Sequence, residues 1–133
     1  MNYKIIVAIV LVLVVVAAWA FNANREQNFK TVSVTEFAEL IKDTANVQLL
    51  DVRTNEEYNE GHIQGALQID FKSADFMDWA TMKLSKGKPV AIYCRGGRRS
   101  ASAAEKLAKE GYELINLDGG IMAWESEGMP IER

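Results

Sequence analysis

The chain begins with an unbroken apolar run and then changes to short apolar segments separated by polar ones. Residues 5–21 carry no charged side chain, and the polar residues 22–28 follow them directly. As a helix, these residues would span roughly 26 Å, close to the hydrocarbon thickness of a bilayer at about 30 Å. The run is apolar on every side, without the polar face of a helix that covers a globular core. Residues 1–24 are therefore predicted to form a hydrophobic helix that targets the chain to a membrane.

Two interpretations of this segment stay open. Aromatic residues at both ends, Tyr3, Trp19 and Phe21, match an interfacial belt and favour a transmembrane anchor through residues 5–21. The alternative is a cleavable signal, with Lys4 as a minimal positive region and a small-x-small site at Ala18–Ala20, cut after Ala20. The lysine and arginine asymmetry across the run is weak, but the very short N-terminal tail favours export of the body. We expect an inner-membrane anchored protein with a periplasmic domain, or a soluble periplasmic one if the signal is cleaved.

From residue 29 to 133 the pattern alternates between short apolar runs and amphipathic segments, which predicts one globular domain. Caps are predicted at Thr35, Thr54 and Ser100, with Glu57 completing a capping box after Thr54. Repeated strand–helix units predict an α/β domain of three layers, a central, largely parallel sheet flanked by helices. The predicted strands are 31–34, 47–50, 66–69, 90–93 and 114–117, and the predicted helices are 36–41, 54–58, 73–84, 100–110 and 121–127.

Composition narrows the functions that this domain can have. The 133-residue chain has a net charge of −3 and no basic block outside one loop, which argues against nucleic-acid binding. Its single cysteine, Cys94, cannot form an intrachain disulfide or build a zinc site. Nothing in the sequence resembles a metal or nucleotide site, so neither a metal nor a cofactor is expected. A free thiol exported to an oxidising compartment is a liability unless it has a use.

Cys94 opens a loop that follows a predicted strand directly, where active sites of parallel α/β folds lie. Nearby cations and a helix N-terminus favour the thiolate, which is the reactive form of cysteine. Two adjacent glycines allow successive backbone N–H groups to converge on an anion. An inert, buried cysteine beside solvated arginines is the alternative, but packing alone does not need three arginines and a Gly-Gly turn. The loop is Cys94, Arg95, Gly96, Gly97, Arg98, Arg99 and Ser100.

Three segments in this order resemble the signatures of the rhodanese family of sulfurtransferases, over about residues 31–132. The Cys94 loop resembles that family's active-site loop. The run 51–53, followed by 57–58 and 61–66, resembles its N-terminal signature, and 117–124 resembles its C-terminal one. The resemblance implies that Cys94 takes sulfur from a small anionic donor such as thiosulfate, holds it as a persulfide, and passes it to cyanide or a thiol, including a protein thiol. It also implies that Arg95, Gly96, Gly97, Arg98 and Arg99 bind substrate, with most weight on Arg95 and Arg99, and that Asp51, Arg53 and Ser100 support the site.

The length of the Cys94 loop distinguishes a sulfurtransferase from a cysteine phosphatase. Arg99 follows Cys94 with four residues between them, whereas cysteine phosphatases of similar fold carry five, which suits phosphate or arsenate. A phosphatase or arsenate reductase is thus the less favoured enzyme, and a non-enzymatic sulfur carrier or partner-binding module stays open. His62 is expected to be structural, and Asp51 and Arg53 to brace loops. Phe76, Trp79 and Trp124 are expected in the core, and the acidic residues Glu56, Glu57, Glu105, Glu110 and Glu113 on solvated faces.

Overall fold

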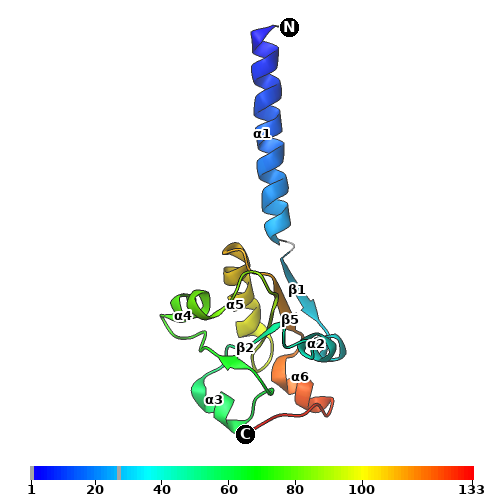
Figure 1. The fold of residues 1–133 in the computed structure, drawn as a ribbon, viewed down its shortest axis with the longest axis vertical. Coiled ribbons are helices and arrows are strands. Elements are labelled where there is room, and N and C mark those ends of the chain that lie inside the picture. The colour runs from blue at the N-terminus through cyan, green and yellow to red at the C-terminus, as the bar shows by residue number, and fades with distance from the viewer. Residues whose placement is uncertain (1, 27) are drawn as a thin grey trace.

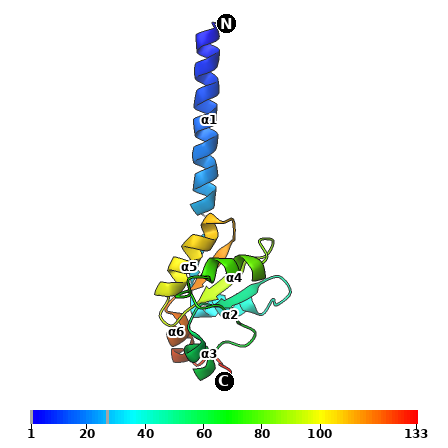
Figure 2. The same ribbon diagram turned by 90° about the vertical axis from the view of Figure 1, so that its left-hand side faces the viewer.

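The computed structural model describes residues 2–26 and 28–133, with side-chain surroundings given for 2–20 and 28–133. The apolar run forms one long helix, α1 (Tyr3–Glu26), which projects from the rest of the molecule (Figures 1 and 2). Its window Tyr3–Ala20 has a mean hydropathy of 2.6 and is not buried against the domain. Its length and composition suffice for crossing a membrane, which a signal sequence would also satisfy. The side chain of Phe21, one of the predicted interfacial aromatics, lies outside the described residues.

The strands of the domain form one parallel sheet in the order β1-β5-β4-β2-β3, which confirms the predicted α/β architecture. Every connection therefore crosses over through a helix or a longer segment, as parallel pairing requires. The strands are β1 (Phe29–Val32), β2 (Gln48–Asp51), β3 (Leu67–Gln68), β4 (Val90–Tyr93) and β5 (Leu114–Leu117). The helices of the domain are α2 (Val34–Ile41), α3 (Asn55–Glu60), α4 (Phe76–Lys83), α5 (Arg98–Lys109) and α6 (Gly120–Ser126).

Apolar side chains cover both faces of the sheet and create three layers. On one face, α4 and α5 pack against the sheet through side chains such as Phe76 and Leu107. On the other face, α2 and α6 contribute Phe37 and Trp124, whose rings meet edge to face at 6.3 Å. Because β4 and β5 are covered on both sides, all four residues of each strand are buried. This burial explains why both strands appear in the sequence as continuous apolar runs.

Two of the predicted helix caps are wrong, and the helix predicted to begin at residue 73 begins at Phe76. Helix α2 is capped by Ser33, not Thr35, because the Ser33 side chain accepts a hydrogen bond from the Glu36 N–H at 3.2 Å. Accordingly, β1 ends at Val32. Helix α5 begins at Arg98, after Gly97 turns the chain with φ 101°, so Ser100 lies inside the helix and is not its N-cap.

Two side-chain environments also differ from the predictions. Trp79 was predicted to lie in the core, but it is 46% exposed, and the Lys83 ammonium lies 5.3 Å from its ring centroid. The core position on that helix is taken by Phe76 and Ala80 instead. Glu57 was predicted to lie on a solvated face, but it forms an ion pair with Arg99. By contrast, the capping box of Thr54 and Glu57 is present as predicted.

Candidate active site around Cys94

Cys94 lies where β4 ends, and the loop that it opens folds back over its own sulfur. The side chain is 1% exposed. Its Sγ accepts a hydrogen bond from the Gly97 backbone N–H at 3.1 Å, and the Ser100 hydroxyl lies 3.3 Å from it. That hydroxyl also lies 3.2 Å from the Gly97 carbonyl oxygen. The Gly97 N–H donates fully to the sulfur, while the Ser100 hydroxyl shares its one proton between the sulfur and the Gly97 oxygen; both favour negative charge on a sulfur that is shielded from bulk water.

The start of α6 holds the loop from the other side. The N–H groups of Ile121 and Met122 donate to the carbonyl oxygens of Cys94 and Arg95, at 2.9 and 3.1 Å. This approach is possible only because residue 120 is glycine: a Cβ there would lie 2.4 Å from the Arg95 oxygen, and its φ is +60°. Gly120 therefore lets α6 dock on the Cys94 loop.

Asp51 and Arg53 form a buried ion pair beside the loop. The Arg53 Nη2 lies 2.7 Å from Asp51 Oδ2, and its Nε lies 3.0 Å from Oδ1. The same guanidinium donates to the carbonyl oxygens of Gly61 and Glu57, at 2.7 and 3.3 Å. Burial opposes the charge, but the hydrogen bonds and charge of Asp51 outweigh it and raise the Arg53 pKa. The pair thus ties the end of β2 to the middle and the C-terminal end of α3, which is the geometry of a brace.

Arg99 is engaged by a residue that sequence reasoning did not connect to it. Its Nη1 and Nη2 lie 2.8 and 2.9 Å from Glu57 Oε1 and Oε2. The bidentate hydrogen bonds from Arg99, together with those from Thr54, lower the pKa of Glu57 from 4.5 to about 2. The Glu57 hydrogen bonds likewise raise the Arg99 pKa. Arg99, expected to contact substrate, is committed to a carboxylate in this structure.

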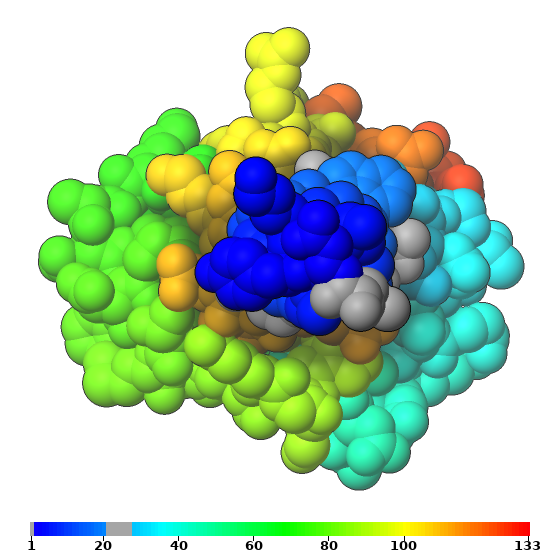
Figure 3. Space-filling model, turned by 90° about the horizontal axis from the view of Figure 1, so that it is seen from above, coloured from blue at the N-terminus to red at the C-terminus, as the bar shows by residue number. Residues whose placement is uncertain are grey.

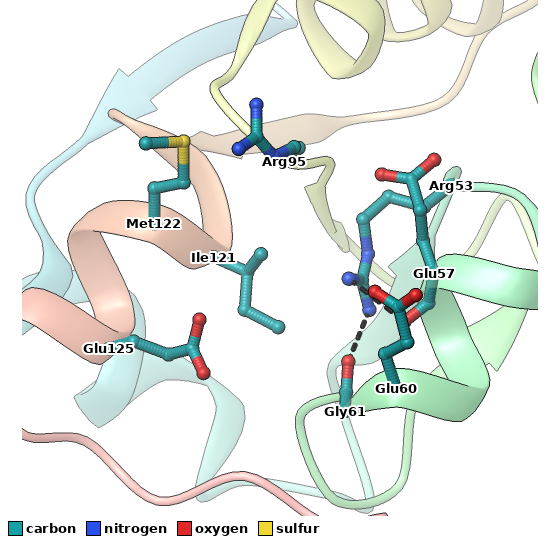
Figure 4. A pocket seen from close by; sticks show the side chains of 8 residues that line it. All are labelled: Arg53, Glu57, Glu60, Gly61, Arg95, Ile121, Met122 and Glu125. Carbon is teal, nitrogen blue, oxygen red and sulfur yellow. Dashed lines mark hydrogen bonds between the residues drawn. The ribbon is translucent and has the colours of Figure 1, made fainter.

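The other two loop arginines are exposed to solvent. Arg95 lines a cleft of about 280 Å³ between α3 and α6, next to the Cys94 loop (Figure 4). Carboxylates of Glu60 and Glu125 stand at opposite sides of this cleft, and Ile121 and Met122 give it an apolar wall. Arg98 does not line the cleft. The structure therefore leaves Arg95 as the guanidinium best placed to meet a ligand there.

His62 is held by structural contacts. Its Nδ1 lies 2.9 Å from the Tyr58 carbonyl oxygen, and its ring stacks on Tyr58 with the centroids 3.7 Å apart. Its Nε2 lies 3.5 Å from the Glu132 carboxylate, and its backbone pairs with the same residue. These contacts join α3 to the C-terminal segment. Within residues 2–26 and 28–133, no group of His, Cys, Asp and Glu side chains is arranged to hold a metal ion.

Comparison with known proteins identifies the family behind this geometry. The model of the rhodanese-like domain family matches residues 33–127, which is most of the chain. The chain belongs to the rhodanese family. The crystal structure of a rhodanese-like domain protein from Staphylococcus aureus is 33% identical, covers 78% of this chain and 99% of its own, and superposes with a TM-score of 0.66.

Two of the curated relatives carry the names of sulfur-transferring enzymes. A sulfurtransferase of Allochromatium vinosum is 39% identical over 92 residues, which cover 68% of this chain and 83% of the relative. The thiosulfate sulfurtransferase GlpE of Shewanella oneidensis is 32% identical over 99 residues, which cover 73% and 93% of the two chains. The family and these relatives support sulfurtransferase activity for this rhodanese.

Proposed function

We propose that this rhodanese is an exported sulfurtransferase that takes sulfane sulfur from a small anionic donor such as thiosulfate and delivers it through a persulfide on Cys94. The observation that carries the proposal is the pair of donors at the Cys94 sulfur, from the Gly97 N–H and the Ser100 hydroxyl. Such donors favour an anionic nucleophile without a general base. The single histidine, which is bound elsewhere in the fold, is not needed for this chemistry.

The reaction runs as two displacements at sulfur. The Cys94 thiolate attacks the outer sulfur of thiosulfate; a new S–S bond forms on Cys94 while the S–S bond to sulfite breaks, and sulfite leaves with the electron pair. A nucleophilic acceptor, cyanide or a thiolate, then attacks the terminal sulfur of the persulfide and releases the Cys94 thiolate. No oxidant or reductant is consumed, because the sulfane sulfur only changes partners.

The loop supplies the electrostatics for both steps. Gly96 is exposed and Gly97 turns the chain, so backbone N–H groups are available to the sulfur and to an oxyanion beside it. Arg95 lines the cleft and binds the anionic donor, and Arg98 adds positive charge outside the cleft. Arg99 acts from its ion pair with Glu57, holding the loop rather than gripping the donor. Ser100 donates to the sulfur, and Asp51 and Arg53 brace the surrounding segments.

The commitment of Arg99 also argues against a phosphatase or an arsenate reductase. The Cys-x5-Arg loop that suits phosphate or arsenate is one residue longer than the loop here, whose last arginine is paired with Glu57 at 2.8 Å. A sulfur carrier that docks on a partner would keep the persulfide but would not turn over with small molecules. Repeated turnover of thiosulfate and cyanide separates the enzyme from the carrier.

The decisive experiment compares the wild-type chain with Cys94→Ser in a thiosulfate:cyanide sulfurtransferase assay, followed by intact mass after thiosulfate treatment. Wild type is expected to turn over and to gain about 32 Da, one sulfur, which a thiol removes. The matched control is the double variant Cys94→Ser, Ser102→Cys, which keeps one thiol per chain but moves it to an exposed position on α5. Equal activity of wild type and Cys94→Ser would refute the role of this residue.

We also propose that α1 anchors the protein in the inner membrane through residues 5–21 and places the domain, residues 29–133, in the periplasm. The apolar, unburied helix supports the anchor. Fractionation and N-terminal sequencing of the protein from cells test this proposal. A mature chain that starts after Ala20 in the soluble fraction would establish a cleaved signal instead.

A further inference from the structure

The point where α1 enters the domain lies at the opposite end of the sheet from Cys94. Helix α1 ends at Glu26 and β1 begins at Phe29, so the connection is short. The Asn28 carbonyl oxygen accepts a hydrogen bond from the Leu114 N–H at 2.7 Å, which fixes the connection to the start of β5. Because β1, β5 and β4 are parallel, their starts share one pole of the domain and their ends share the other. Cys94 follows the end of β4.

The views along and across the molecule show the same arrangement. Helix α1 rises from one pole and contacts α5, while α3 and α6, which border the cleft, lie at the opposite pole (Figures 1 and 2). Seen along α1, the helix stands over the middle of the domain (Figure 3). The cleft beside the Cys94 loop therefore faces away from the side on which α1 enters.

The length of the connection prevents the domain from turning over. If α1 leaves the bilayer at residue 21, residues 22–28 reach at most about 25 Å even when fully extended. A domain the size of residues 29–133 has a radius of gyration of about 13 Å and a thickness of roughly 30 Å. To bring the Cys94 pole to the bilayer, the connection would have to pass around the domain and detach β1 from β5. The fold does not permit that movement.

We infer that the Cys94 site exchanges sulfur with a water-soluble partner and is closed to any donor or acceptor carried in the membrane. The inference rests on the proposed anchoring of α1, and it defines the substrate class of the proposed sulfurtransferase. A soluble thiol, free or on a protein, approaches the cleft from the aqueous side. A thiol or electrophile fixed at the lipid headgroups stays at the wrong pole.

The test labels the sole thiol of the full chain reconstituted in vesicles. N-Ethylmaleimide reaches Cys94 from solution, whereas a phospholipid with a maleimide headgroup reaches it only from the bilayer. The matched variant carries a 30-residue Gly/Ser insertion after Glu26, which gives a flexible tether of roughly 30 Å. We expect equal labelling of both proteins by N-ethylmaleimide and about tenfold slower labelling of the native chain by the maleimide lipid, since only the long tether lets the site approach the bilayer. Cys94→Ser controls for reaction elsewhere.

Rapid labelling of the native chain by the maleimide lipid, at the rate seen with the long-tether chain, would overturn the inference. The sulfur reaction provides a second readout: glutathione should discharge the persulfide in both proteins, and a thiol-bearing lipid only in the long-tether variant. If thiosulfate never loads Cys94 but the labelling contrast holds, the proposed donor chemistry fails and the orientation stands. If loading succeeds and the contrast is absent, the orientation fails alone.

Discussion

Replacing Glu57 by Gln tests whether the ion pair with Arg99 stabilises the Cys94 loop. Gln has the same shape and keeps a side-chain oxygen that can accept from the Thr54 backbone N–H, but it removes the charge that Arg99 binds through a bidentate contact. The side chains of both partners are about three-quarters buried, so solvent screens the pair only in part. The variant should fold and lose stability without losing the capping box.

The magnitude follows from the Glu57 pKa. A fall from 4.5 to about 2 on folding corresponds to about 3 kcal/mol of preference for the charged form, at 1.36 kcal/mol for each pKa unit. The Arg99 hydrogen bonds are the largest cause, and the Thr54 cap contributes part of the shift. We therefore expect Glu57→Gln to cost about 2 kcal/mol of unfolding free energy at pH 7.

The pH dependence has a definite sign. The folded-state pKa of Glu57 is depressed, so its stabilisation is complete above pH 4.5 and is lost as the pH falls toward 2. The stability gap between wild type and Glu57→Gln should therefore be constant from pH 7 to 5 and should shrink below pH 4.5. Guanidinium unfolding in detergent measures it, with Trp19 replaced by Phe so that fluorescence reports the domain.

Two controls make the measurement specific. Glu56→Gln removes a neighbouring carboxylate that forms no ion pair among the described residues, and it should change stability by less than about 0.5 kcal/mol. A double-mutant cycle with Arg99→Gln should give a coupling energy of about 1–3 kcal/mol. A gap that stays the same from pH 7 to pH 2.5, or a coupling energy of zero, would refute the role of the pair.

Two further substitutions probe the loop itself. Gly120→Ala forces a Cβ to 2.4 Å from a loop carbonyl oxygen at φ +60°, and should cost about 3 kcal/mol or more in chemical unfolding; Gly96→Ala, with no atom near its Cβ, should cost less than about 1 kcal/mol. Ser100→Ala removes a donor to the Cys94 sulfur and should slow alkylation of the thiol by iodoacetamide about fivefold at pH 7. Ser102→Ala, exposed on the same helix, should leave that rate unchanged, and equal rates for the two serine variants would contradict the proposed donor.

The central strands and the Thr54 capping box could be predicted residue by residue, whereas the caps of α2 and α5 could not. The runs 90–93 and 114–117 match β4 and β5 because strands buried on both faces must be apolar throughout. At the start of α2, both Ser33 and Thr35 are suitable caps. In the structure the Ser33 hydroxyl accepts from the Glu36 backbone N–H, three residues on, which places the helix start two residues before Thr35 would.

The contacts of the candidate site that the sequence does not predict join segments that lie far apart along the chain. Glu57 and Arg99 are 42 positions apart, and no local pattern in either segment points to the other. The capping box identifies Glu57 as a residue at the start of a helix, where a side chain exposed to solvent is the usual expectation. Similarly, Gly120 looked like a turn residue, because its close approach to the Arg95 carbonyl depends on where α6 docks. Local sequence predicts elements, while such contacts exist only once the sheet has set the spacing of its loops.

These contacts change how the charge of the loop should be understood. The three arginines of the loop suggest a strongly positive site, but Arg99 is paired with Glu57. Arg53, beside the loop, is likewise paired with Asp51. Arg95 and Arg98 remain as unpaired cations of the loop within the described residues, and two carboxylates share the cleft with Arg95. The cleft therefore combines charges of both signs beside the Cys94 loop. That balance suits the two half-reactions proposed above, in which the anionic product sulfite must leave before an acceptor takes the sulfur.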